Sequence, residues 1–407
     1  MEVVIAGGGI GGLTLALALH AHGIPSRVFE AAPEIRPLGV GVNLLPHATA
    51  ALDRLGLLPA LEAVAVTTYE ASYFNRFGQL ILSEPLGRRA GYDHPQLSIH
   101  RADLHAVLLE AARTRIGAER ITLGARCISV DETRGIARFV DSRSGAALPD
   151  AQGTAIIACD GFHSAVRAQF FPDEGPPIYS GVNMWRGVTR MAPILSGATM
   201  VRAGWLAQGK MVIYPIRRYE DGTVLMNWVA EIETPHYLAN DWARPGGLDD
   251  FLPAFADWRF DWCDVPAMIQ GAEIVLEYPM VDRDPLPRWS HGRVTLLGDA
   301  AHPMYPRGSN GAGQAILDAV ALADCLSATH DPVEALADYE RRRLGPTSAV
   351  VRTSRTAPPD VVIKTVWERT GDKPFRRIED VIPPEELMAL VDRYKQVAGY
   401  SKAAIKP

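Results

Sequence analysis

The first thirty residues constrain the fold more than any other part of the chain. A β-branched run at 2–6 leads directly into G-G-G-I-G-G at 7–12, and an Ala- and Leu-rich stretch follows at 13–22. A second strand is expected at 26–30, and its last residue is Glu30. This order of strand, glycine-rich turn, helix, strand and acid is typical of a dinucleotide-binding βαβ unit.

The glycines of this turn have separate physical roles. Gly7 serves the tight turn, Gly9 lets the backbone approach a pyrophosphate, and Gly12 allows the helix to pack closely on the strand. Free N–H groups and the partial positive charge at the helix N-terminus favour the phosphates. Glu30 is placed to accept hydrogen bonds from an adenosine ribose. The fingerprint alone does not separate FAD from NAD, and a glycine-rich turn can be only a turn.

Two later strand ends favour FAD. The segment 155–167 predicts a buried strand followed by Asp160, and 293–326 predicts a strand, then Asp299, a Pro- and Gly-rich loop and a helix from about 310. Asp299 is placed to accept from a ribityl hydroxyl, and the N–H groups of 311–313 favour negative charge on the pyrimidine end of a reduced flavin. Taken singly, each Asp could equally be a cap or a turn residue.

These three segments resemble the FAD motifs of the FAD-dependent aromatic hydroxylases of group A, the para-hydroxybenzoate and salicylate hydroxylase type. Further stretches are similar to the phenazine hydroxylases of pyocyanin biosynthesis, among them E-I-R-P-L-G-V-G-V-N at 34–43, L-S-I-H-R-A-D-L at 97–104 and Y-P-M-V-D-R-D-P-L-P-R-W at 278–289. The resemblance spans roughly 1–350, and residues from about 351 onward depart from the phenazine hydroxylases. The family loop often has Gln or Lys where this chain has Asn310.

The resemblance implies a role for each matching residue. Glu30 would contact the adenosine ribose, Asp160 would serve FAD and nicotinamide binding, and Asp299 would hold the ribityl chain. Pro306 is the one residue assigned to the catalytic side of the flavin, beside the carbon that carries the peroxide. In full, the cofactor-binding residues implied are Gly7, Gly9, Gly11, Gly12, Glu30, Arg36, Gly41, Val42, Arg101, Asp160, Asp299, Gly311, Ala312 and Gly313.

The expected fold class is α/β (α+β), with a Rossmann-type FAD-binding domain, an inserted and mainly antiparallel substrate domain, and a C-terminal helical segment. The FAD-binding domain is discontinuous because its motifs lie near both ends of the chain. We expect it at 1–70, 96–175 and 281–350, and the substrate domain at 71–95 and 176–280. The tail, 351–407, is expected to be helical. The individual helices predicted outside the FAD motifs lie near 248–258 and at 332–343 and 382–398, with a break at Pro358-Pro359.

The aromatic residues indicate where a planar substrate would lie. Seven of the eight tryptophans fall within 185–289, as a flat-ring pocket would need. The candidate pocket residues are Tyr214, Trp228, Trp185, Pro303 and Met304, of which Tyr214 and Trp228 come first because both fall mid-strand. Any single tryptophan could instead belong to the core. Arg186, Arg217 and Arg218 could neutralise a substrate carboxylate or could simply lie at the surface.

Composition excludes several classes of partner. Forty-one basic residues against 47 acidic ones give a net charge of −6, which favours neither nucleic acid nor anionic lipid. The apolar run at 13–19 is too short to span a membrane. The four cysteines are scattered without a C-x-x-C pair, as is typical of reduced thiols in the cytoplasm, and no metal site is expected. We expect a cytoplasmic monomer or homodimer whose partner is a small aromatic molecule.

The resemblance implies a monooxygenase that uses FAD, NADH or NADPH, and O2. It would hydroxylate an aromatic or N-heteroaromatic small molecule, carboxylated and phenazine-like compounds included, via a flavin hydroperoxide, either by simple or by decarboxylative hydroxylation. Two alternatives stay open: an FAD oxidase or reductase without productive oxygen transfer, and a non-catalytic flavoprotein that sequesters an aromatic ligand. No general base is assigned, because His47, His236 and His302 are each compatible with a structural role.

Overall fold

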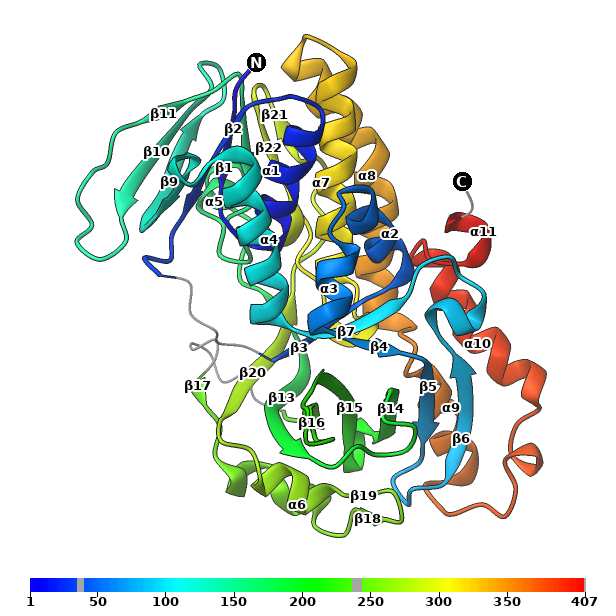
Figure 1. The fold of residues 1–407 in the computed structure, drawn as a ribbon. Helices are drawn as coiled ribbons and strands as arrows, with labels where there is room; N and C mark the ends of the chain where they lie inside the picture. Colours follow the sequence, from blue (N-terminus) through cyan, green and yellow to red (C-terminus); the bar gives the residue numbers. More distant parts are fainter. Residues whose placement is uncertain (35–39, 236–243, 406–407) are drawn as a thin grey trace.

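The computed structural model describes residues 1–34, 40–235 and 244–405. A parallel sheet with its helices lies above a large, mainly antiparallel sheet, and the C-terminal helices run along one side of both (Figure 1). The expected α/β fold class, with an antiparallel second sheet and a helical C-terminal segment, is confirmed.

The first sheet has six strands and carries the glycine-rich unit. In spatial order they are β21 (Ser290–His291), β22 (Val294–Leu296), β12 (Ala155–Ala158), β1 (Val3–Ala6), β2 (Ser26–Glu30) and β8 (Ile121–Leu123). Neighbouring strands from β22 to β8 run parallel, and only β21 pairs in the antiparallel sense. Every residue of β1 and β12 is buried, as expected for a parallel sheet enclosed on both faces.

Parallel pairing brings the three sequence motifs to one edge of this sheet. In β1, Ala6 pairs with Ala158 of β12, and the register continues from β12 to β22. Each motif follows its strand directly, so Gly7, Asp160 and Asp299 emerge at the same carboxyl edge. In open α/β sheets this edge is where ligands bind.

The helices that pack against this sheet begin at the same edge. They are α1 (Ile10–Ala21), α4 (Arg101–Ile116), α5 (Ala165–Phe170) and α7 (Gly311–Ala328), and α2 (Pro46–Arg54) and α3 (Leu58–Val64) pack beside them. A small antiparallel sheet of β9 (Ala125–Asp131), β10 (Ile136–Asp141) and β11 (Ala151–Gln152) lies outside β2 and β8 (Figure 1).

The second large sheet has eight strands. In order they are β17 (Arg244–Pro245), β20 (Val275–Asp282), β13 (Ile178–Met191), β16 (Val224–Glu233), β15 (Gly209–Arg218), β14 (Thr199–Trp205), β5 (Glu70–Phe74) and β6 (Leu80–Pro85). Pairing is antiparallel except between β5 and β14. The β5–β6 hairpin therefore joins a sheet whose other strands come from 178–282.

The face of this sheet away from the FAD motifs is covered by short elements. The helix expected near 248–258 is wrong: the chain forms two 3-10 turns, η4 (Leu248–Asp250) and η5 (Leu252–Phe255). Pro253 lacks the N–H that a continuous helix would need at this point. A two-stranded ribbon, β18 (Arg259–Phe260) and β19 (Cys263–Asp264), and α6 (Val265–Gln270) complete this layer.

A three-stranded antiparallel sheet lies between the two large ones (Figure 1). Its strands are β3 (Gly41–Leu44), β7 (Gln96–His100) and β4 (Val66–Thr68). Gly41 ties this sheet to the one below it: its N–H donates to Asn227 Oδ1 at 2.7 Å and its carbonyl accepts from Arg186 Nη2 at 3.0 Å.

The C-terminal segment is helical, but its first helix is longer than predicted. The helix expected at 332–343 continues to Thr356 as α8 (Pro332–Thr356), with the exposed Pro346 inside it. The buried Val350 and Val351 show why, since packing of the later turns outweighs the hydrogen bond lost at Pro346. Three further helices follow, α9 (Val361–Thr370), α10 (Pro384–Val397) and α11 (Lys402–Ile405), and α10 agrees with the expected 382–398.

A buried cluster of charges attaches this segment to the eight-stranded sheet. Asp360, just before α9, accepts from Arg202 Nη1 at 2.7 Å and from Lys210 Nζ at 2.5 Å. Lys210 Nζ also donates to both oxygens of Glu231 at 3.0 Å. Burial alone would raise the pKa of Asp360, but Lys210 and Arg202 hold it below its ordinary value.

Asp360→Asn is expected to destabilise the fold by about 3–5 kcal/mol, because it leaves two buried cations without their shared counter-charge. Urea unfolding at pH 7 measures the effect. Glu379→Gln, which removes an exposed partner of Arg377, is the matched control and should change stability by no more than about 0.5 kcal/mol. Because the folded pKa of Asp360 is depressed, its contribution is present above the ordinary carboxyl pKa and is lost as pH falls through the folded value. Equal midpoints for Asp360→Asn and wild type would contradict the assignment.

Candidate active site

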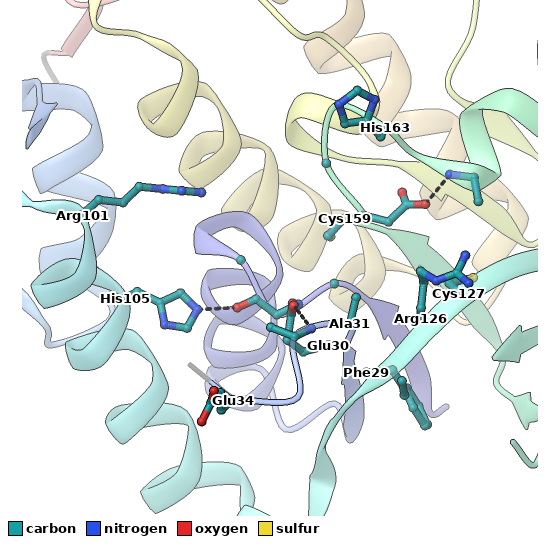
Figure 2. Close-up of a pocket in the computed structure, with 18 of the residues that line it drawn as sticks. Phe29, Glu30, Ala31, Glu34, Arg101, His105, Arg126, Cys127, Cys159 and His163 are labelled. Carbon is teal, nitrogen blue, oxygen red and sulfur yellow. Dashed lines mark hydrogen bonds between the residues drawn. The ribbon is translucent and has the colours of Figure 1, made fainter. Parts of the chain in front are cut away.

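A cavity of about 530 Å³ opens at the carboxyl edge of β1, β2 and β12 (Figure 2). The glycine-rich turn, the end of β2, the start of α4, strand β9 and the segment after β12 each contribute to its wall. Among its lining residues are Gly7, Gly8, Gly9, Phe29, Glu30, Arg101, His105, Arg126, Cys127, Asp160 and His163. The structure thus brings together four of the residues that the sequence predicted on separate segments: Gly7, Glu30, Arg101 and Asp160.

The glycine-rich turn can be built only with glycine at two places. Gly7 has φ +113°, and a side chain there would overlap the carbonyl of Cys159. A side chain at Gly12 would overlap the carbonyl of Gly7. Gly9, in contrast, has no neighbour within 4 Å where a side chain would start. Helix α1 begins beside it without a capping side chain or an acidic residue in its first turn, so its N–H groups are free for an anion.

Glu30 holds the turn in place from the neighbouring strand. Its Oε2 accepts from the N–H of Gly8 at 2.6 Å, and its Oε1 accepts from the N–H of Ala32 at 2.7 Å. A carboxylate has about four acceptor sites, so each oxygen keeps capacity for a ligand hydroxyl. The side chain is only half-buried and borders the cavity.

Helix α4 presents a pair of side chains to the cavity. Arg101 and His105 lie one turn apart and both project toward it (Figure 2). His105 Nε2 lies 2.7 Å from the carbonyl oxygen of Gly8, so Nε2 carries the proton and Nδ1 is left as an acceptor. The sequence prediction named Arg101 and missed His105. The four-residue spacing in R-A-D-L-H was the signal that could have found it.

Asp160 contributes an acceptor without a partner. Its Oδ2 accepts from the N–H groups of Ala165 at 2.9 Å and Val166 at 3.4 Å, at the start of α5. Its Oδ1 is buried and has no hydrogen-bond partner among the residues that the structure describes. Burial raises the pKa of Asp160. A carboxylate that lines a cavity and has one buried oxygen without a partner is characteristic of a functional site.

The start of α7 is a second helix N-terminus without a side-chain cap. Asp299 is exposed in the 3-10 turn η6 (Gly298–Ala300), and a methyl group at Gly311 would lie 4.0 Å from its Oδ1. Helix α7 has neither a side-chain cap nor an acidic residue in its first turn. A side chain at Gly11 would lie 2.8 Å from Leu297 Cδ2 and 3.4 Å from Ala315 Cβ, so Gly11 serves the close packing of α1 on α7.

Two uncapped helix starts packed side by side, with Glu30 at one end and Asp299 at the other, fit an extended dinucleotide. The glycine-rich turn leaves room for a pyrophosphate at Gly9. The unpaired Oδ1 of Asp160 can accept a hydrogen bond from a ligand. The residues present therefore fit FAD.

The comparisons with known proteins agree. The FAD binding domain family matches residues 1–232 and 278–354. Over 362 residues, 87% of this chain and 89% of the relative, the chain is 46% identical to phenazine 1,6-dicarboxylic acid hydroxylase PhzS of Lysobacter antibioticus. It is 33% identical over 364 residues, 88% of each chain, to 3-hydroxybenzoate 6-hydroxylase 1 of Aquipseudomonas alcaligenes.

The chain belongs to the FAD-dependent aromatic hydroxylases. A solved salicylate hydroxylase substrate complex has the same fold, with a TM-score of 0.74 at 24% identity over 100% of this chain and 98% of that one. The predicted family, the use of FAD and the monooxygenase reaction on a small aromatic substrate are thereby confirmed.

In this hydroxylase the loop before α7 is held by a buried ionic network. His302 Nε2 pairs with Asp318, whose Oδ1 accepts from Arg343 Nε at 2.7 Å. Burial alone would raise the pKa of Asp318, but His302 and Arg343 hold it below its ordinary value. His302 is therefore committed at Nε2 to a structural partner. Burial and Arg343 lower the pKa of His47 to about 3, so this histidine is neutral at physiological pH.

The remaining predicted loop residues follow His302. Pro303 is buried, Met304 is half-buried, and Pro306 is exposed at the start of the 3-10 turn η7 (Pro306–Gly308). Arg36 and His236 lie outside the residues that the structure describes.

Strand β3 lies directly on the eight-stranded sheet at Tyr214. A methyl group at Gly41 would lie 2.6 Å from Tyr214 Cε2, and the next residue, Val42, is half-buried. Tyr214 belongs to an apolar cluster on this face of the sheet, and burial raises the pKa of its hydroxyl.

The two predicted pocket tryptophans lie on the other face. Trp228 pairs across the strands with Ile213, the neighbour of Tyr214, so it points to the opposite side of the sheet. Its Nε1 donates to Thr189 Oγ1 at 3.0 Å in a closed core, and Trp185 stacks on Phe251 in the same core at 5.1 Å. The expectation that Trp228 and Trp185 share a pocket with Tyr214 is corrected, because successive side chains of a strand alternate between faces.

Two of the three predicted arginines are also committed elsewhere. Arg217 forms a forked ion pair with Asp103 at 2.6 Å, and Arg218 Nη2 donates to the carbonyl of Gly197 at 2.8 Å. Arg186 lies on the same face as Tyr214, and its Nε is buried without a partner among the described residues.

Within residues 1–34, 40–235 and 244–405 no helix is long and apolar enough to cross a membrane. In the same ranges no three His, Cys, Asp or Glu side chains gather to hold a metal ion. The four cysteines are free thiols.

Asp160→Asn is expected to stabilise the FAD-free protein at pH 7. A carboxyl whose folded pKa is raised favours folding below its unfolded pKa and loses that contribution as pH rises through the folded value. The amide keeps the acceptor for Ala165 and removes the buried charge. In thermal unfolding from pH 3 to 8, the midpoints of Asp160→Asn and wild type should converge at the acid end. A lower midpoint for the variant than for wild type at pH 7 would contradict this expectation.

Trp228→Ala is expected to cost about 3–5 kcal/mol of stability, because it opens a large cavity in a closed core. FAD content and substrate-stimulated activity should then fall together with the folded fraction. Tyr214→Phe, on the other face, is the matched control and should change substrate response with a smaller loss of stability. The core assignment fails if Trp228→Ala keeps the wild-type urea midpoint and alters only substrate affinity.

Proposed function

We propose that this enzyme hydroxylates a fused N-heteroaromatic carboxylate of the phenazine type, with NADH or NADPH as reductant. The observation that carries the substrate class is the 46% identity to phenazine 1,6-dicarboxylic acid hydroxylase, over 87% of this chain and 89% of that one. The relatives named for single rings, 3-amino-4-hydroxybenzoate, 3-hydroxybenzoate and 6-hydroxynicotinate, share only 30–34% identity.

The proposed reaction converts a ring C–H to C–OH. One oxygen atom of O2 enters the ring, the other leaves as water, and NAD(P)H with one proton supplies the two electrons and becomes NAD(P)+. FAD, when bound, supplies the activation of dioxygen that this reaction requires. The chain's own residues bind and orient the cofactor and the substrate, and they exclude water from the reacting atoms.

The residues of the cavity would hold the cofactor at its adenosine end. Glu30 and the free Nδ1 of His105 offer acceptors for ribose hydroxyls, and Arg101 offers donors for phosphate. The free N–H groups at Gly9 and the start of α1 favour the pyrophosphate. Asp160 offers an acceptor where the segment after β12 meets the cavity.

The start of α7 would hold the flavin end. Asp299 offers an acceptor for a ribityl hydroxyl, and the N–H groups of 311–313 offer donors where negative charge develops on a reduced flavin. Gly41 and Val42 lie on the strand that faces the sheet below, and Pro306 lies in the loop that leads into α7.

The substrate would lie on the Tyr214 face of the eight-stranded sheet. The side chains of this face form an apolar cluster that includes Val212, Ile216 and Tyr305, and such a lining keeps water from the reacting atoms. Arg186 is the residue on this face that we assign to a substrate carboxylate, because its Nε has no partner in the described structure.

A substrate panel tests this function. The purified holoenzyme is supplied with NADH or NADPH and, one at a time, phenazine-1,6-dicarboxylate, phenazine-1-carboxylate, 3-hydroxybenzoate, 3-amino-4-hydroxybenzoate and 6-hydroxynicotinate. We expect the phenazines to stimulate NAD(P)H oxidation most and to yield a product heavier by one oxygen atom in mass spectrometry. Stimulation and product only with the single-ring acids would overturn the substrate class, and hydrogen peroxide without product from every compound would favour the oxidase reading.

Asp299→Ala is expected to weaken FAD binding at least tenfold, since a charge-assisted hydrogen bond contributes about 1.5–3 kcal/mol. Titration of the FAD-free protein, followed by quenching of flavin fluorescence, measures this. Asp173→Ala, which removes an exposed carboxylate near α5, should bind FAD as the wild type does. Full FAD occupancy and normal turnover in Asp299→Ala would refute its role at the ribityl chain.

A further inference from the structure

The C-terminal segment reaches the loop that leads into α7. Tyr394, on α10, is buried, and its hydroxyl accepts a hydrogen bond from Asn310 Nδ2 at 2.9 Å. Asn310 is the residue that immediately precedes α7 and is itself buried. A contact between residues 84 positions apart thus joins the tail to the proposed flavin end of the site.

The same tyrosine explains the glycine at 308. Gly308 does not have a left-handed backbone, so its backbone conformation does not demand glycine. A side chain there would instead overlap Tyr394 Oη and Cζ. The hydroxyl end of the Tyr394 ring fills the space beside Gly308, so a residue with a side chain at 308 is incompatible with tyrosine at 394.

The backbone next to Gly308 is strained. Ser309 has φ +55°, a left-handed conformation that non-glycine residues seldom adopt. Such a conformation persists where its surroundings hold it. Here Asn310 Nδ2 donates both to the carbonyl of Gly308 at 3.2 Å and to Tyr394, which fixes the residues on either side of Ser309.

Two further contacts join the tail to the first turn of α7. Gln314 Nε2 donates to the carbonyl of Ala398 at 3.3 Å. Tyr400 stacks on His47 with ring centroids 5.6 Å apart, and a methyl group at Gly313 would lie 3.2 Å from His47 Nε2. The segment 394–400 therefore makes several separate contacts at or beside the start of α7.

We infer that Tyr394 is a positioning residue for hydroxylation: its docking holds the loop 306–310 and the first turn of α7 in the geometry that oxygen transfer needs. The inference rests on the proposed function for its activity readout. When the loop is loosened, less of the NAD(P)H consumed should yield product and more should yield hydrogen peroxide, in the balance NAD(P)H + H+ + O2 → NAD(P)+ + H2O2.

The first experiment compares Tyr394→Leu and Tyr394→Phe with wild-type holoenzyme on the best substrate of the panel. Tyr394→Leu removes both the hydroxyl and the ring that fills the space beside Gly308. We expect the fraction of hydrogen peroxide formed per NAD(P)H consumed to rise at least threefold in Tyr394→Leu, while its KM for substrate stays within twofold of the wild-type value. The peroxide fraction of Tyr394→Phe should lie between those of Tyr394→Leu and wild type. FAD affinity, from fluorescence quenching, should weaken two- to fivefold in Tyr394→Leu.

Leu387→Ala is the matched control. Leu387 is buried on the same helix, in the apolar cluster that packs α10 on β5 and β6, and it does not contact the loop through any hydrogen bond of the described structure. We expect it to lower the thermal midpoint without changing the peroxide fraction. A peroxide fraction in Tyr394→Leu no higher than in Leu387→Ala would overturn the inference.

The second experiment tests the fit of Gly308 and Tyr394 without any substrate. The thermal midpoint of the holoenzyme is measured for Gly308→Ala, Tyr394→Leu and the double variant. We expect Gly308→Ala to lower the midpoint at least twice as much in the wild-type background as in Tyr394→Leu. If Gly308→Ala alone fails to fold, recovery of folded holoenzyme in the double variant is the expected result, and equal losses in both backgrounds would overturn the inference.

These readouts separate the two proposals. A wild-type enzyme that hydroxylates none of the panel would overturn the proposed function, while the thermal cycle and the FAD affinity would still decide whether Tyr394 positions the loop. A wild-type enzyme that hydroxylates a phenazine with a Tyr394→Leu variant equally productive would overturn the inference alone.

Discussion

Parallel pairing of β1, β12 and β22 is the constraint on which the site depends. Strands that run in the same direction end at the same edge, so three motifs from widely separated parts of the chain meet there. The glycine turn, Asp160 and Asp299 follow their strands immediately, and α1 and α7 pack closely because Gly11 carries no side chain. Two uncapped helix starts then lie beside each other, as a dinucleotide with two separated sites of negative charge requires.

The second constraint is the attachment of the C-terminal segment. The buried pairs of Asp360 with Arg202 and Lys210 anchor its first part to the eight-stranded sheet, where each partner would be costly alone. From this anchor, α10 and the residues after it reach the loop before α7. Segments that a domain division would place apart are thus in direct contact: Tyr394 bonds to Asn310 and fills the space beside Gly308, and the carbonyl of Ala398 accepts from Gln314 in the first turn of α7.

Much of the fold and of the candidate cofactor site could be predicted from local signals. Gly7, Glu30, Asp160 and Asp299 each stand at the end of a strand that the sequence marks by a β-branched or apolar run. His105 was missed although it stands one helical turn after Arg101. The prediction that Trp228 and Trp185 line the substrate pocket failed for a different reason. Trp228 and Tyr214 lie on adjacent paired strands, and a single-residue shift in register decides which face of the sheet each side chain takes.

By itself, the amino-acid sequence determined the βαβ unit, the order of the motifs and the family, because these depend on short-range spacing and on backbone positions that only glycine can occupy. Tertiary structure alone decided which aromatic residues face the site, which arginine keeps a free donor, and that Tyr394 fills the space beside Gly308. These outcomes follow from strand register and from contacts between residues tens to hundreds of positions apart. No local pattern encodes them, since each depends on a partner that arrives only when the chain folds.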